Sequence, residues 1–178
     1  NIHSAAEHAL ALMLSVAPAL AQVASPTPAP AVPTEPRETI EGTLSQDRTV
    51  IAVPAFATPA VTTVAGLRTD NLGRQIADVI AADLERSGLY APLGPGSVRA
   101  ISMAEVRAPR FADWQARNAE NVVHGFVQTN STGGFVVGCY LYDTQLGSEL
   151  VRQGFEIQPG DWRRAAHKCA DAIYSRLS

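Results

Sequence analysis

Three segments rich in β-branched and aromatic residues follow one another in the second half of the chain, and only short turns separate them. The segments are Val122–Thr129, Phe135–Asp143 and Leu150–Ile157. Both turns contain glycine, at Gly133 and Gly134 in the first and at Gly147 in the second. Because strands joined by such short connections pair as antiparallel neighbours, the pattern predicts a three-stranded antiparallel meander.

Two longer segments place apolar residues at helical spacing. In the first, Asp70–Ser87, the apolar face contains Leu72, Ile76, Val79, Ile80 and Leu84. Asp70 stands where an N-cap is expected, and Gly88 stands where a left-handed residue would end the helix. In the second, which follows Pro159-Gly160-Asp161, the apolar face contains Trp162, Ala165, Ala166, Cys169, Ile173 and Leu177. We expect two long helices that cover one face of the sheet.

The remaining segments complete an α/β pattern. Thr49–Val53 is a β-branched run ended by a proline, which is typical of a buried strand. Phe56–Leu67 is predicted as a loop, and so is Tyr90–Gly96, because it holds two prolines and two glycines. Phe111–Ala119 is predicted as a short helix that carries Trp114. The predicted fold class is therefore α/β, a mixed sheet with an antiparallel three-stranded meander covered on one face by two long helices.

The N-terminal segment has the pattern of a secretory signal peptide. Ala9–Ala19 is an apolar run of the length of an h-region, and Ala19 and Ala21 fit an A-x-A cleavage site before Gln22. Asn1–His8 carries no Lys or Arg, so the positive n-region is incomplete. The alternative is a short buried apolar helix. We predict that residues 1–21 are a cleaved signal peptide and that the mature chain is exported, to the periplasm in a Gram-negative host.

A proline-rich stretch follows the predicted cleavage site. Five prolines stand between residues 22 and 36, and proline cannot continue a helix or donate to a strand ladder. Residues 22–38 are therefore predicted to be an extended linker, and residues 39–178 the folded domain. The linker is interpreted as a passive spacer, with a ligand for a polyproline-binding groove as the alternative.

Charge and composition exclude several classes of protein. The chain has 14 Lys and Arg against 17 Asp and Glu, so no basic excess is available to hold nucleic acid. No apolar run reaches the roughly 18 residues that suggest a membrane-spanning helix. Two cysteines are too few for a structural zinc site of the usual kind.

Candidate chemistry is sparse, and no catalytic, cofactor-binding or metal-binding residue is predicted. His124 and His167 lack further ligands at metal-site spacing. Asp143 and Asp161 could form a carboxylate pair, but each stands where a turn or a helix cap favours aspartate. The chain contains neither a phosphate-binding glycine loop nor a Gly-x-Ser-x-Gly motif. A pocket lined by His124 and Asp143 would favour an enzyme.

The two cysteines are predicted to pair. Cys139 shares a strand face with Phe135, Val137 and Leu141, while Cys169 lies on the apolar face of the last helix. Both should point into the core between helix and sheet, and export places them in an oxidising compartment. We predict a Cys139–Cys169 disulfide, with two reduced buried thiols as the alternative.

Several segments, taken in order, resemble the TolB family of the Tol–Pal system. Val50–Phe56 (VIAVPAF) is similar to the family's IAVPDF strand, and Ile76–Leu93 (IADVIAADLERSGLYAPL) to its first helix and exit. Further resemblance lies in Asp113-Trp114, Val122–Val127, Leu141–Asp143 and Arg176-Leu177. The agreement in order and spacing runs from about Ile40 to Leu177.

The resemblance implies a non-catalytic adaptor without cofactors that supports outer-membrane integrity and cell division. It implies an N-terminal domain similar to an anticodon-binding fold, a C-terminal β-propeller that binds Pal, and a mature N-terminus that binds TolA. The chain ends at Ser178, so Pal binding would require a following propeller and is assigned to no residue here. The best counterpart of the TolA-binding segment is Ile40, Glu41, Gly42, Thr43 and Leu44. The alternative function is a stand-alone exported module of this fold, in envelope assembly or small-ligand binding.

Overall fold

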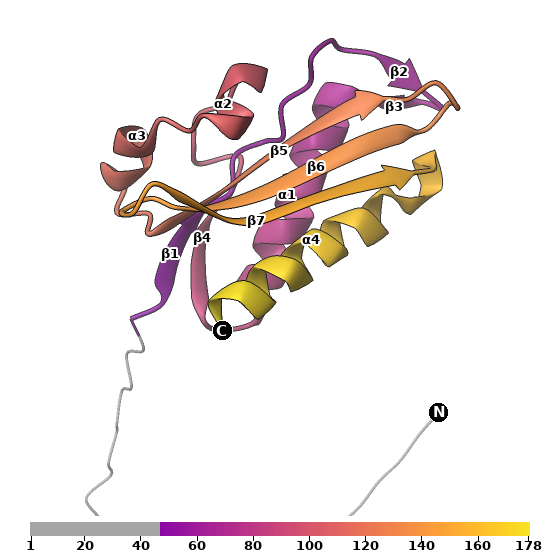
Figure 1. The fold of residues 1–178 in the computed structure, drawn as a ribbon. Coiled ribbons are helices and arrows are strands. Elements are labelled where there is room, and N and C mark those ends of the chain that lie inside the picture. Colours follow the sequence, from indigo (N-terminus) through magenta and orange to yellow (C-terminus); the bar gives the residue numbers. More distant parts are fainter. Residues whose placement is uncertain (1–46) are drawn as a thin grey trace, which may run out of the picture. The chain divides into compact units, whose positions relative to one another are not determined.

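A five-stranded mixed sheet with helices on both faces forms the domain (Figure 1). The computed structural model describes residues 47–178. The predicted signal peptide, the predicted linker and the segment Ile40–Leu44 lie outside the described residues.

The sheet combines a parallel half with the predicted meander. The strands are β1 (Thr49–Ala52), β4 (Tyr90–Leu93), β5 (Asn121–Thr129), β6 (Phe135–Asp143) and β7 (Ser148–Ile157), in the order β4-β1-β5-β6-β7. β1 is parallel to β4 and to β5, whereas β5, β6 and β7 pair in antiparallel fashion. The predicted meander is therefore confirmed, and Gly133 and Gly147 adopt the left-handed backbone that its two turns require.

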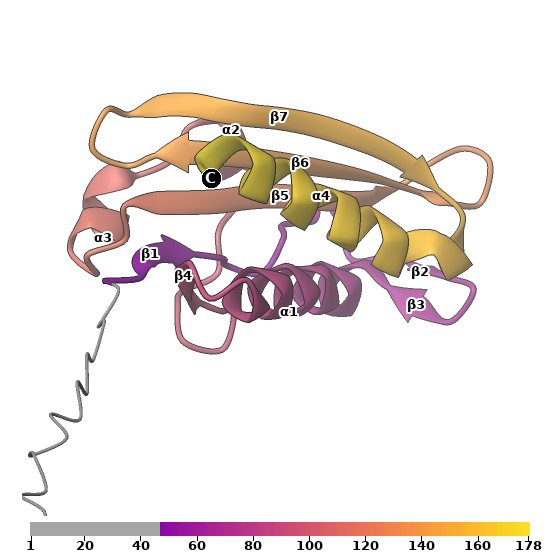
Figure 2. The same cartoon turned by 90° about the horizontal axis from the view of Figure 1, so that it is seen from below.

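The two long helices lie together on one face of the sheet, as predicted (Figure 2). They are α1 (Thr69–Arg86) and α4 (Trp162–Leu177), the latter preceded by the 3₁₀ turn η1 (Pro159–Asp161). Their apolar faces share one core with alternate strand residues such as Val123 and Val137. Two short helices, α2 (Met103–Arg107) and α3 (Phe111–Gln115), cover part of the opposite face. There Val106 and Trp114 pack on Val122, Tyr140 and Tyr142.

Three predictions about local structure were wrong. Tyr90–Gly96 is not entirely loop, since its first four residues form β4. Pro92 is tolerated there because β4 lies at the margin of the sheet, where one side of the strand needs no N–H donors. Phe56–Leu67 is not entirely loop either, because it contributes to a hairpin of β2 (Thr63–Val64) and β3 (Leu67–Arg68).

The third error concerns the start of α1. Arg68 occupies the N-cap position, and Asp70 lies in the first helical turn, where its carboxylate pairs with Arg68 at 2.8 Å. A carboxylate in the first turn still interacts favourably with the positive end of the helix. The other end follows the prediction, because Gly88 adopts a φ of +76° just beyond the helix.

Candidate partner-binding site

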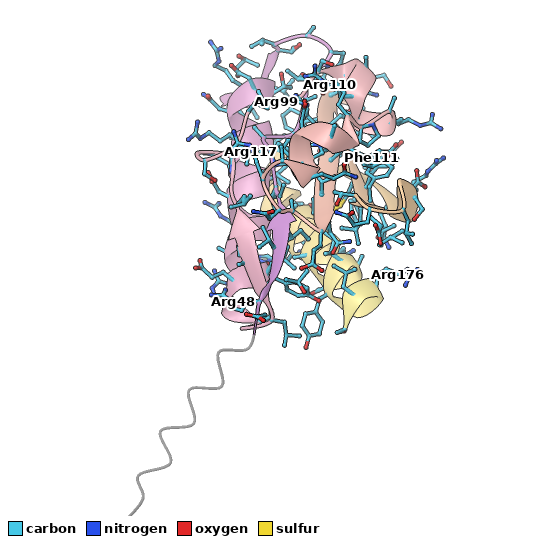
Figure 3. All side chains as sticks on the ribbon, turned by 90° about the vertical axis from the view of Figure 1, so that its left-hand side faces the viewer. Arg48, Arg99, Arg110, Phe111, Arg117 and Arg176 are labelled. Carbon is cyan, nitrogen blue, oxygen red and sulfur yellow. A yellow bond between two sulfur atoms is a disulfide. The ribbon has the colours of Figure 1, made fainter. Side chains whose placement is uncertain are left out.

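The start of β1 is the point where the described domain meets the segment predicted to bind a partner. The side chain of Arg48 donates a hydrogen bond to the carbonyl oxygen of Tyr90, and the Thr49 amide donates to the Leu89 carbonyl at 3.1 Å. Both contacts join the start of β1 to the chain at the start of β4. Figure 3 shows Arg48 at the end of the domain where β1 begins. The chain entering the domain is therefore held at a defined position.

A shallow depression of about 440 Å³ adjoins this anchor. It is lined by Asp47, Arg48, Thr49, Gly88, Leu89, Tyr90 and Leu177. The ring of Tyr90 packs edge-on against Tyr174 of α4, with 6.4 Å between ring centroids. The buried Tyr90 hydroxyl has no hydrogen-bond partner among residues 47–178, and burial raises its pKa. Leu89 and Tyr174 are exposed, so this end of the domain combines apolar and polar groups of the kind that protein interfaces use.

A second group of side chains forms an ion-pair cluster around α2 and α3. The Arg99 guanidinium contacts the Glu105 carboxylate at 2.6 Å and the Asp113 carboxylate at 2.7 Å, and Arg110 reaches Glu105 at 2.9 Å. Hydrogen bonding to Arg99 lowers the pKa of Glu105 to about 2. Arg99 also lies over the indole ring of Trp114, 5.0 Å from its centre. Figure 3 shows Arg99 and Arg110 close together, at the opposite end of the view from Arg48.

This cluster was not predicted from the sequence, although one local signal for it exists. Ser102 and Glu105 form a capping box at the start of α2, in which each side chain accepts a hydrogen bond from the backbone N–H of the other residue. A Ser-x-x-Glu pattern is a recognised helix start. The cluster pairs its positive charges with carboxylates, so it ties α2 to α3 and leaves little net charge for binding an ion.

The structure does not bring His124 and Asp143 into one pocket. His124 is fully buried between Trp114 and Tyr142, and its Nδ1 lies 2.8 Å from the carbonyl oxygen of Glu105. Burial lowers the pKa of His124 to about 4. Asp143 instead accepts two backbone hydrogen bonds, from Gln145 and Leu146, as its predicted turn role requires. The arrangement offers no accessible acid–base pair at these positions.

The other candidate residues, Asp161 and His167, also have structural roles. Asp161 occupies the N-cap position of α4 but makes no side-chain cap bond, and it lies 3.5 Å from Arg164. His167 contacts Asp83 at 2.5 Å, a link between α4 and α1 that sequence spacing alone does not reveal.

Within residues 47–178, no group of three or more His, Cys, Asp or Glu side chains is placed to hold a metal ion. No helix in that part of the chain is both long and apolar enough to cross a membrane.

The structure places Cys139 of β6 and Cys169 of α4 side by side, as the predicted disulfide requires. Their Cα atoms lie 6.2 Å apart, and 30 positions separate them in sequence. Both residues are completely buried in the core under α1 and α4. The predicted bond would fix α4 to the middle strand of the meander.

Comparisons with family models and with curated proteins lead to one family. Residues 40–150 match the family model described as the TolB amino-terminal domain. The Tol-Pal system protein TolB of Sphingopyxis alaskensis is 77% identical over 169 residues, which are 95% of this chain and 37% of that protein. Tol-Pal system protein TolB 1 of Novosphingobium aromaticivorans is 46% identical over 93% of this chain and 37% of its own length. The chain thus spans little more than a third of these curated relatives.

A solved structure has the same fold. The crystal structure of TolB from Acinetobacter baumannii superposes with a TM-score of 0.56 at 25% sequence identity. The match covers 74% of this chain and 28% of that one. It supports the mixed α/β architecture described above.

Proposed function

This chain belongs to the TolB family, and on that premise we propose that it serves as a non-catalytic adaptor of the Tol–Pal system in the periplasm. In this role it binds protein partners and supports outer-membrane integrity and cell division. The segment Ile40–Leu44 is the proposed binding segment, and TolA is the proposed partner. Pal binding would belong to a propeller of the kind that the resemblance implies for longer family members.

The observation that carries this proposal is the anchor at the start of β1. Arg48 and Thr49 hold the chain against the backbone of Leu89 and Tyr90, only four residues after Leu44. A binding segment placed immediately before such an anchor reaches its partner from a defined point on a rigid domain. The match to the family model begins at residue 40, so it includes this segment.

The described residues bring none of the candidate catalytic side chains together, and this also supports an adaptor. His124, whose pKa is lowered by burial, lies between aromatic rings. The ion-pair cluster around Arg99 joins α2 to α3. An enzyme would instead need titrating groups that converge on an accessible cleft.

The proposal is tested by deleting residues 39–44 from the full chain. We expect binding to the purified C-terminal domain of TolA to weaken at least tenfold by calorimetry, with an unchanged melting temperature. A deletion of residues 27–32, equal in length but within the proline-rich stretch, is the matched control and should retain binding. Unaltered TolA binding by the first variant would refute the assignment of Ile40–Leu44.

A further inference from the structure

Strand β7 forms one margin of the sheet, and no strand within residues 47–178 pairs with its outer side (Figure 1). It is ten residues long and contains no proline, whereas β4 at the opposite margin has four residues and contains Pro92. In an antiparallel ladder, alternate residues direct their N–H and C=O groups away from the neighbouring strand. The outer side of β7 therefore offers a row of backbone groups able to pair with another strand.

The side chains of β7 alternate between the two faces of the sheet. Those that pack against the core under α1 and α4 are half-buried and apolar, namely Val151, Phe155 and Ile157. Arg152 and Glu156 lie on the opposite face, which they share with Tyr140, the register partner of Arg152 in β6. One face of this strand is therefore apolar, and the other carries an exposed charge of each sign.

The two charged residues differ in their surroundings. The Arg152 guanidinium contacts the Glu149 carboxylate at 2.8 Å and lies over the ring of Tyr140, 5.7 Å from its centre, so this cation is held in place. Glu156 has no Lys, Arg or His partner within 4.0 Å among residues 47–178. Gly154 lies between the two, and a Cβ atom there would meet nothing within 4 Å. A glycine inside a strand often marks a place where another backbone approaches closely.

The segment Val151–Ile157 is complementary to itself about Gly154. When two such segments pair in antiparallel fashion with Gly154 at the centre, Arg152 of each copy lies opposite Glu156 of the other. Opposite charges in such cross-strand positions stabilise the pair. On the other face, the two apolar ends of the segment lie opposite each other. A pair centred on Arg152 would instead place this cation opposite its own copy, so charge selects the Gly154 register.

We propose that the outer side of β7 binds a second copy of this chain, through an antiparallel pair of β7 strands centred on Gly154. Main-chain hydrogen bonds between the strands join the two sheets into one, and two Arg152–Glu156 pairs fix the register. The interface is isologous, because a two-fold axis perpendicular to the joined sheet relates the copies. It is separate from the anchor at β1 and uses no residue of Ile40–Leu44.

The α4 helices of the two copies lie on the same side of the joined sheet, since α4 lies alongside β7 (Figure 2). The charges in the groove between β7 and α4 balance, because Asp161 and Glu156 line it together with Arg164 and Lys168. Asp161 and Arg164 also contact each other at 3.5 Å. The two helices therefore meet without an excess of either sign. Because only the seven residues of Val151–Ile157 pair, we expect a weak dimer.

The first test measures self-association of the full chain by sedimentation equilibrium, at protein concentrations from about 10 μM to 1 mM. We expect a reversible equilibrium between monomer and dimer. By NMR, amide exchange should slow at every second residue of Val151–Ile157 as the concentration rises. A monomer at every concentration, or dimers in which protection is confined to other elements, would overturn the proposal.

Charge reversal tests the register. Arg152→Glu alone and Glu156→Arg alone should each weaken dimer formation about tenfold, since each places like charges opposite each other, while far-UV circular dichroism stays unchanged. Mixed in equal amounts, the two variants should form a heterodimer with an affinity within about threefold of the wild-type dimer. In that heterodimer every cross-strand pair again joins opposite charges. Failure of the mixture to recover association would contradict the Gly154 register.

A matched control reverses an exposed charge far from β7. Arg74→Glu, on α1, should leave the dimer affinity within about twofold of wild type. An equal loss in this control would show that net charge, and not the β7 register, governs association. Deleting residues 39–44 should not affect the dimer, so the proposal and the TolA assignment can fail independently.

Discussion

At the scale of single residues, buried polar groups and close contacts of glycine dominate the behaviour of the domain. His124 lies between aromatic rings at the centre of the face covered by α2 and α3. Gly125, next to it, faces the other core. A Cβ atom at Gly125 would overlap the ring of Phe56, which is itself buried. In β5, His124 therefore places a titratable side chain in one core, while Gly125 leaves the space that the Phe56 ring occupies in the other.

The stability of the protein should fall as the pH is lowered from 7.5 to 5. Burial lowers the pKa of His124 from 6.5 to about 4 in the folded chain, so only the unfolded chain binds a proton in this range. The expected loss is about 2 kcal/mol of unfolding free energy, measured by urea titration. His124→Gln should be less stable at pH 7.5 but should lose much less on acidification. Equal pH dependence in the two proteins would contradict this account. Glu105 contributes only below about pH 4.5, since its folded pKa is about 2.

Gly125→Ala should destabilise the domain by about 1 to 3 kcal/mol, because the buried Phe56 ring has little room to move. Gly154→Ala is the matched control in the same sheet, since a Cβ atom there meets nothing within 4 Å. We expect the control to change stability by less than about 0.5 kcal/mol. Urea unfolding of both variants measures the difference. Similar stability of the two variants would show that Phe56 relaxes freely.

At the scale of elements, apolar packing attaches α4 to the sheet, and the predicted disulfide would add a covalent link. Its buried face repeats at helical spacing, from Trp162 to Ile173, and packs in the same core as α1. His167 and Asp83 join the two helices at their exposed sides. The predicted disulfide would also tie α4 to β6, at the point where Cys139 and Cys169 lie side by side.

The Cys139–Cys169 pairing stays a prediction for the protein in solution. Intact mass after alkylation without reductant should show no added label, and labelling of both cysteines would contradict the pairing. For a loop of this length, the chain-entropy model gives a contribution of about 3 to 4 kcal/mol. The double variant Cys139→Ala and Cys169→Ala should therefore unfold at a clearly lower temperature. Reducing the wild-type protein should have a similar effect.

At the scale of the whole molecule, the two cores share their strands. In β5, Val122 belongs to the core under α2 and α3, while Val123 belongs to the core under α1 and α4. Because each strand supplies side chains to both faces, loss of one core removes support from the other. The domain should consequently unfold as one cooperative unit.

Cooperativity can be measured with the two tryptophans, which lie in different cores. Trp114 belongs to the core under α2 and α3, and Trp162 to the core under α1 and α4. In the single variants Trp114→Phe and Trp162→Phe, the remaining tryptophan reports on one core. Within each variant, the urea midpoint from fluorescence should coincide with the midpoint from circular dichroism. Separate midpoints in either variant would show that the cores unfold independently.

Elements with strong local signals could be predicted from the order of the amino acids. Periodic apolar residues predicted α1 and α4, and glycine-containing turns between β-rich runs predicted the meander. The family followed from motifs along the same segments. These features could be read because each depends on residues close together in the chain.

Features that depend on residues far apart in the chain could be found in the folded domain but not in the sequence. Tyr90–Leu93 is a strand because it pairs with β1, and its proline is tolerated because of its place at the margin. Asp143 completes a turn, whereas His124 is buried beneath α3, so two residues that could have formed a site are kept apart. The contact between His167 and Asp83 likewise arises from the packing of α4 against α1. Local secondary-structure propensity does not predict such contacts, since they join residues far apart in sequence.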